Sequence, residues 1–366
     1  MVTVKTNFEN FFKIYFPIKF IFLFIYIILL NLFSLEIGHF LTKEYSIFYT
    51  VDSSIHYFSC NVNSANILFT LTSCVLNIKS ISNLLPILIT LTITLIKDLL
   101  FIICASKFLN NKGMLIFIIL LAVHPYLGIY SLKYSTDIFA NLGIAVLFYQ
   151  MVFNKNGIYM NILSVILVGF RNNLLPVFFV YYLFLLILSI KKSNINEFFK
   201  YALLIISIYF ITQIGTGSYD TGIFYDFIFT NQNPFSWYKA VEFLGLTHSF
   251  MSYVISLPIF LFTHMVLLTG FREAVFVHGF YFLIDLGLAG YLQLIFFILL
   301  SCFHIVGTVS FYYYFKNKSY YFFIVLLYII PTFIALSHLR YFMPIIPIAL
   351  IGISALIQKK LLKNLR

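Results

Sequence analysis

The chain has 366 residues, of which 62% are hydrophobic and only 10% are charged, and its mean hydropathy is +0.99. Soluble domains carry about 25% charged residues, so this composition excludes a soluble globular fold and predicts an integral membrane protein. The net charge of +11 would suggest nucleic acid binding in a soluble chain. Here the basic residues lie in short segments between apolar runs, where they fix topology, and we expect no nucleic acid partner.

Apolar runs in chain order predict the membrane spans, because a helix needs about 20 such residues to cross the hydrocarbon. A further run, 250–268, should re-enter, lie in the interface, or cross twice together with the region after it. The sequence therefore predicts one all-α polytopic domain, 1–366, with about 10–12 transmembrane helices. The predicted spans are 17–35, 84–105, 114–131, 136–153, 157–170, 173–190, 199–214, 286–311, 320–336 and 341–357.

Lysines between the spans predict the topology. When the spans alternate in direction, every lysine cluster falls on one side, which the positive-inside rule makes cytoplasmic. Both termini then lie inside, and the long segments 36–85 and 215–285 become outer, periplasmic loops of the kind that usually carry function. Within the second loop, residues 236–246 are predicted to form an amphipathic helix. The clusters are Lys5, Lys13 and Lys19; Lys107 and Lys112; Lys155; Lys191, Lys192 and Lys200; Lys316 and Lys318; and Lys359, Lys360 and Lys363.

The remaining polar residues fall on the predicted outer face, where charges at the membrane boundary are costly and usually functional. Arginine binds phosphate oxygens in a bidentate manner, and a nearby aspartate can act as general base on a hydroxyl group. These residues therefore suit a ligand that is both anionic and lipidic. The candidates are Asp52, Lys133, Asp137, Arg171, Arg272, His278, His338 and Arg340.

Simpler interpretations stay open at several of these positions. Asp137 could only cap the helix that begins in "YSTDIF", and Arg171 could only extend to the interface. Arg272 could be neutralised by the adjacent Glu273. His124 precedes Pro125 and could be a packing histidine beside a kink, whereas Lys97 and Asp98, adjacent within a predicted span, could pair with other helices or line a cavity.

Three segments resemble the outer-face elements of GT-C type glycosyltransferases, which are multi-pass enzymes that use polyprenyl-linked donors. They are "HPYLGIYSLKYSTDIFANLG" (124–143), "GFRNNLLPVFF" (169–179) and "SHLRYFMPIIPI" (337–348). Within that superfamily, the size, the composition rich in Ile, Phe, Tyr, Asn and Lys, and the large late outer loop are similar to bacterial O-antigen and capsule repeat-unit polymerases.

The resemblance implies roles for particular residues. Arg340 and Tyr341, before the last helix, would meet the lipid phosphate, and Asp52, in the first outer loop, would be a base or a metal ligand. From their place on the outer face, Arg171, Arg272, Lys133 and His278 are further candidate phosphate or sugar ligands, and Asp137 and His338 are the other catalytic candidates. That loop lacks a paired D-x-D motif, so no metal or other cofactor is expected.

The resemblance also implies a location and partners. The chain would lie in the bacterial inner membrane and join undecaprenyl-diphosphate-linked oligosaccharides at the periplasmic face, in contact with membrane lipid and a chain-length regulator protein. One alternative is a GT-C transferase with a polyprenyl-monophosphate sugar donor. Another is a lipid-linked oligosaccharide flippase or other transporter. Transporters often have inverted repeats and charge at mid-membrane, whereas here the charge gathers at one face.

Overall fold

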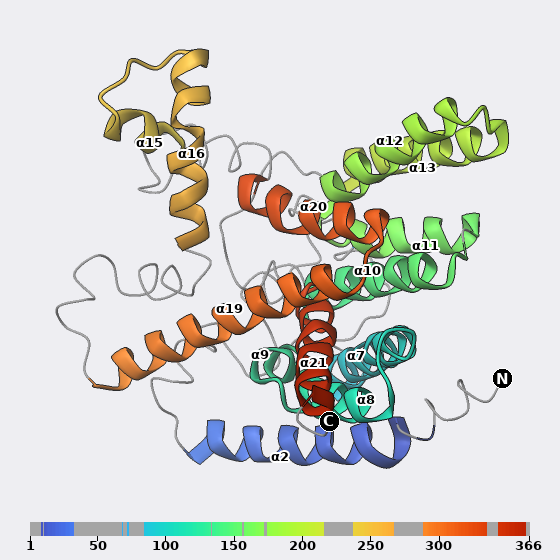
Figure 1. Ribbon diagram of the computed structural model, residues 1–366, viewed down its shortest axis with the longest axis vertical. Helices are drawn as coiled ribbons and strands as arrows, with labels where there is room; N and C mark the ends of the chain where they lie inside the picture. The colour runs from blue at the N-terminus through green and yellow to red at the C-terminus, as the bar shows by residue number, and fades with distance from the viewer. Residues whose placement is uncertain are drawn as a thin grey trace.

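The computed structural model describes residues 9, 11–32, 68, 72, 84–132, 134–155, 157–171, 174–215, 237–266, 288–334 and 343–363, and all the elements that these residues form are helices (Figure 1). In chain order these are η1 (Phe11–Tyr15), α2 (Phe16–Leu32), α7 (Leu84–Ala105), α8 (Asn111–Val123), α9 (Pro125–Tyr130), α10 (Thr136–Phe153), α11 (Ile158–Gly169), α12 (Leu175–Lys191), α13 (Ile195–Gly215), α15 (Trp237–Phe243), α16 (Phe250–Val266), α19 (Leu288–Tyr314), α20 (Lys318–Ile334) and α21 (Ile346–Lys363).

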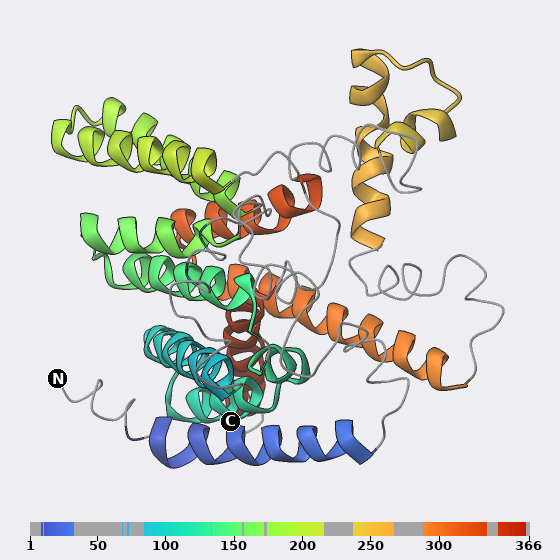
Figure 2. The same ribbon diagram turned by 180° about the vertical axis from the view of Figure 1, so that it is seen from behind.

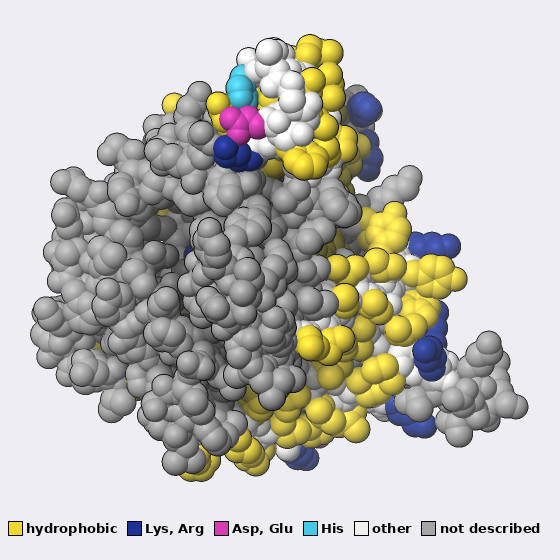
Figure 3. All heavy atoms as spheres, turned by 90° about the vertical axis from the view of Figure 1, so that its left-hand side faces the viewer, with side chains coloured by type: hydrophobic (Ala, Val, Ile, Leu, Met, Phe, Trp, Pro, Cys, Tyr) yellow, Lys and Arg dark blue, Asp and Glu magenta, His cyan; other side chains and the backbone are white. Residues whose placement is uncertain are grey.

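Three helical segments in the described part are long and apolar enough to cross a membrane: Ile87–Ala105, Thr136–Phe153 and Ile195–Thr212. Several shorter helices are similarly apolar. The predicted spans 84–105 and 136–153 have the same bounds as α7 and α10. Hydrophobic side chains also spread over the described surface in Figure 3, as expected where lipid rather than water covers a protein.

The predicted span 114–131 is wrong as a single helix. The structure divides it into α8 and α9 at His124, whose backbone is extended (φ −62°, ψ 118°). Pro125 follows, and proline both lacks an amide hydrogen and disfavours a helical conformation at the residue before it. The break turns α9 away from α8 and frees the His124 ring for the contacts described below.

Contacts between distant segments gather the lysine-bearing ends of several helices at one end of the bundle, here called the lysine end. After α7, the Lys107 ammonium lies 5.1 Å from the ring centroid of Phe153, the last residue of α10. Before α8, the Asn110 amide donates to the Gln358 side chain of α21 at 3.2 Å. Lys359 lies 3.9 Å from the ring of Tyr314, where α19 ends.

Two helical hairpins end on a common side. The turns between α10 and α11 and between α12 and α13 lie at the right of Figure 1 and at the left of Figure 2. Asn154 ends α10 in the left-handed conformation (φ 51°), and its amide donates to carbonyls of the last helical turn, a common way to terminate a helix. The α10–α11 turn carries Lys155. The end of the hairpin opposite to this turn therefore holds the start of α10 and the end of α11.

Helices α19 and α21 cross at two glycines. A Cβ atom on Gly307 would lie 2.4 Å from the Ala349 carbonyl oxygen, and one on Gly352 would lie 1.9 Å from the Gly307 oxygen. Small residues allow such close backbone approach in membrane helices. Met343, just before α21, lies beside polar residues of α7 and α10.

Candidate functional site

Asp137 and Arg171 form a buried ion pair at the end of the α10–α11 hairpin that lies opposite its Lys155 turn. Arg171 Nη1 lies 2.6 Å from Asp137 Oδ1, and the two side chains are only 10% and 3% exposed. The same Nη1 donates to Thr136 Oγ1 at 3.2 Å. Because α10 and α11 pack side by side, the first turn of α10 lies beside the residues that follow α11.

The ion pair bears on the simpler interpretations of both residues. The N-cap of α10 is Ser135, whose side chain forms no capping hydrogen bond, and Asp137 lies inside the first turn with its carboxylate on the guanidinium. The helix N-terminus favours that negative charge. Arg171 lies buried against Asp137, so it does more than extend to the interface.

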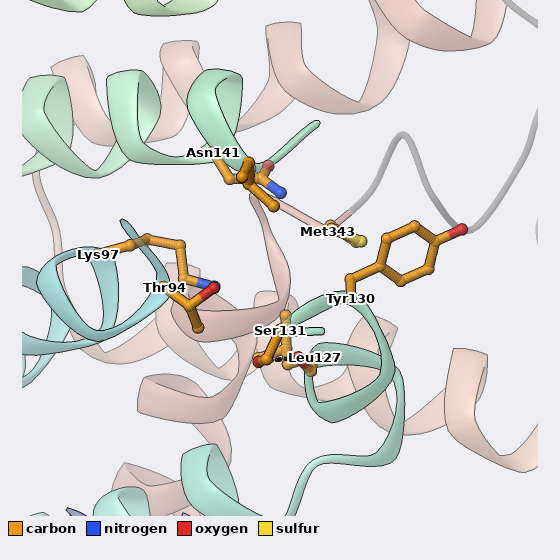
Figure 4. A pocket seen from close by; sticks show the side chains of 8 residues that line it. Thr94, Lys97, Leu127, Tyr130, Ser131, Asn141 and Met343 are labelled. Atoms are coloured by element: carbon orange, nitrogen blue, oxygen red, sulfur yellow. Dashed lines mark hydrogen bonds between the residues drawn. The ribbon is translucent and has the colours of Figure 1, made fainter. Parts of the chain in front are cut away.

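A small polar pocket lies between α7, α9, α10 and the turn before α21, next to the ion pair along α10. Figure 4 shows Lys97 and Thr94 extending from α7 toward Ser131, after α9, with Asn141 of α10 facing the same space. The volume of the pocket is about 10 Å³, which is room for about one water molecule. In this form it admits neither a sugar nor a diphosphate. It is lined by Thr94, Lys97, Leu127, Tyr130, Ser131, Ile138, Asn141 and Met343.

Lys97 also belongs to a second buried ionic group, here called the Lys19 cluster and consisting of Tyr15, Lys19, Lys97 and Asp98. The Lys97 ammonium lies 3.2 Å from Asp98 Oδ1, and the Tyr15 hydroxyl donates to Asp98 Oδ2. Lys19 is 1% exposed, and its ammonium has no hydrogen-bond partner among the described residues. The burial of Lys19 was not foreseen from its place among the lysines near the first predicted span.

Two histidines extend the buried polar region toward α19. His124 Nε2 and His304 Nε2 lie 2.9 Å apart, and His124 Nδ1 accepts the Leu127 amide hydrogen at 3.3 Å. Since Nδ1 is an acceptor, the His124 proton is on Nε2 and is donated to His304, which makes both rings neutral. The interpretation of His124 as a packing histidine with satisfied hydrogen bonds is confirmed, and its partner His304 was not foreseen.

The structure brings together only part of the candidate set proposed from the sequence. Asp137 and Arg171 meet directly. The other candidates, Asp52, Lys133, Arg272, His278, His338, Arg340 and Tyr341, lie outside the described residues, although Met343 of the pocket follows Arg340 and Tyr341 closely in the chain. Within the described ranges, no group of three or more His, Cys, Asp or Glu side chains could hold a metal ion.

Comparison of the chain with protein-family models, with curated proteins and with solved structures found no match. The described residues form a helical bundle with apolar helices of membrane-spanning length and ionisable side chains in its interior.

Proposed function

We propose that the chain is a polytopic inner-membrane glycosyltransferase that joins polyprenyl-diphosphate-linked oligosaccharides at the periplasmic face, as a repeat-unit polymerase does. The observation that carries this proposal is the buried Asp137–Arg171 pair. A carboxylate can accept the proton of a sugar hydroxyl as a general base, and a guanidinium is suited to bind phosphate.

In the proposed reaction, the acceptor sugar hydroxyl gives its proton to the Asp137 carboxylate as its oxygen bonds to the anomeric carbon of the donor. The bond between that carbon and the lipid diphosphate breaks, and its electron pair leaves with the diphosphate. Arg171 stabilises the developing negative charge. Because the neighbouring pocket is small, the site must open for a substrate, and Arg340 and Tyr341 are the proposed phosphate ligands from the segment before α21.

The proposed topology places the lysine end in the cytoplasm and the Asp137–Arg171 pair near the periplasm. It can be tested in a chain whose four cysteines are replaced, with single cysteines introduced as Lys155→Cys, Ser193→Cys or His338→Cys. We expect an impermeant thiol reagent to label only the last of these from outside intact cells. Labelling of His338→Cys from the cytoplasmic side alone contradicts the topology and the proposed site together.

The activity itself is testable with the purified full chain in lipid vesicles. The vesicles are supplied in turn with polyprenyl-diphosphate oligosaccharides and with polyprenyl-monophosphate sugars, and the products are separated by length. We expect longer glycans and free polyprenyl diphosphate from the first donor, and a loss of at least 100-fold in rate for Asp137→Asn, whereas Glu242→Gln, at an exposed ion pair, retains activity. Single-sugar transfer from the second donor alone would favour the alternative transferase.

One observation favours a second candidate function, a lipid-linked oligosaccharide flippase or other transporter. Asp98 lies about two helical turns, or roughly 10 Å, from the end of α7, so the Lys19 cluster places charge well inside the bundle. Charge at that depth is typical of transporters. It weakens the inference, drawn from the gathering of charge at one face, that the chain is not a transporter. In the vesicle experiment, a transporter moves the lipid-linked glycan across the membrane and leaves its length unchanged.

A further inference from the structure

The Lys19 cluster contains an excess of positive charge. With all groups in their usual ionised states, it holds two ammonium groups, from Lys19 and Lys97, and one carboxylate, from Asp98. Lys97 pairs with Asp98 at 3.2 Å, while the Lys19 ammonium is buried without a hydrogen-bond partner in the described part of the chain. An uncompensated charge buried in this way costs several kcal/mol, so the balance must be restored.

Among the described residues, the groups that face Lys19 supply no second negative charge. Tyr15 of η1 donates its hydroxyl hydrogen to Asp98. His124, between α8 and α9, lies within electrostatic reach of both lysines and pairs with His304 as two neutral rings. The ionisable residues left on η1, α8 and α9 are Lys13, Lys112, Tyr126 and Tyr130, none of which is acidic at neutral pH.

We propose that the Lys19 cluster is a proton-binding site in which Lys19 and Lys97 share one exchangeable proton beside Asp98. Without that proton one lysine is a neutral amine and the other an ammonium ion paired with the carboxylate, so the cluster has no net charge. Binding of a proton converts the neutral amine into a second ammonium. The cluster would thereby link the conformation of the bundle to proton uptake, whichever of the two proposed functions holds.

The polar pocket provides the route by which the proton exchanges. Lys97 belongs both to the cluster and to the pocket lining. A water molecule there can hydrogen-bond to the Lys97 ammonium and to the side chains of Thr94, Ser131 and Asn141, which are the polar partners that a buried water requires. The pocket is also lined by Ile138, the residue after Asp137.

The proposal can be tested by measuring the unfolding equilibrium of the full chain between pH 7 and 9. The protein is unfolded in mixed micelles of a mild detergent and dodecyl sulfate, and unfolding is followed by circular dichroism. The unfolded chain holds both lysine protons in this range. As the folded chain loses the shared proton, stability rises with pH, and we expect the unfolding constant of the wild type to fall more steeply with pH than that of Lys19→Met, by up to about tenfold per pH unit, which corresponds to one proton.

Two further variants show whether the pH dependence of unfolding comes from this cluster or from lysines in general. Lys97→Met should lose the same pH dependence as Lys19→Met, because the one remaining lysine stays protonated against Asp98. Lys239→Met removes an exposed lysine that pairs with Glu242 at 2.6 Å and should keep the dependence of the wild type. If Lys19→Met does not fold, Lys97→Met carries the comparison.

Either of two results would overturn the proposal. The first is equal pH dependence in the wild type and in both single-lysine variants, which means that no proton is exchanged at the cluster. The second is a wild-type stability that lacks this pH dependence. Instead, it rises when chloride is added and does not rise when gluconate is added. In that case a bound small anion, and not loss of a proton, balances the second ammonium.

Discussion

The two buried ionic groups of the bundle differ in charge balance and in position. The Asp137–Arg171 pair joins one acid to one base at the start of α10, where the helix N-terminus adds support for the carboxylate. The Lys19 cluster joins one acid to two bases, deeper along α7. A balanced pair near a helix end can be exposed by a small opening and can exchange its partner for a substrate. An unbalanced cluster inside the bundle can change its charge only by exchanging a proton or an ion.

The largest expected effect comes from removing the acid of the unbalanced cluster. Asp98→Asn leaves two buried lysines with no carboxylate, and we expect a loss of about 3–5 kcal/mol in the free energy of unfolding, measured by dodecyl sulfate titration. Adding Lys97→Met to this variant should recover part of the loss, since one excess ammonium is then removed. Glu242→Gln, at an exposed pair, should change stability by less than about 0.5 kcal/mol. A loss in Asp98→Asn no larger than this control contradicts the buried position of the cluster.

Removing the acid of the balanced pair should cost less. Asp137→Asn leaves Arg171 charged, because a guanidinium does not lose its proton, but Arg171 is close to a helix end and can move toward water. We expect a loss of about 1.5–3 kcal/mol in the same titration.

The double variant Asp137→Asn with Arg171→Gln sharpens this result. It should lose less stability than the sum of the two single variants, with a coupling of about 0.5–3 kcal/mol. Strict additivity would show that the two side chains do not interact in the folded chain.

The sequence predicted those parts of the fold that depend on local pattern. Runs of apolar residues gave the bounds of α7 and α10. The adjacent Lys97 and Asp98 were expected to pair with other helices or to line a cavity. They pair with each other, Asp98 also accepts a hydrogen bond from Tyr15 of η1, and Lys97 lines the pocket. The burial of Lys19 was not foreseen because a lysine near the start of a span usually lies at the interface. Its spacing of four from Tyr15, which places both on one helical face, was the available signal.

Partners far apart in the chain were beyond such reasoning. His304 lies in a long apolar helix with no neighbouring motif, and only the packing of α19 beside the break before Pro125 brings it to His124. The pairing of Asp137 with Arg171 was similarly left open. Both residues were candidates on the same face. The sequence is equally compatible with Asp137 as a helix cap and Arg171 as an interfacial arginine, and only the α10–α11 hairpin fixes the distance between them.

The smallest expected effect comes from changing Thr136, the residue before Asp137. It separates the contribution of the Thr136 hydroxyl from that of the Asp137 carboxylate in holding Arg171. Thr136→Val removes only the hydroxyl that accepts a hydrogen bond from Arg171 Nη1 at 3.2 Å and keeps the shape of the side chain. We expect a loss of about 0.5–1.5 kcal/mol in stability. The proposed transfer activity should change less than in Asp137→Asn, because the carboxylate still orients the guanidinium. If Thr136→Val abolishes activity while Asp137→Asn leaves it intact, the hydroxyl and not the carboxylate is the group that matters at this end of α10.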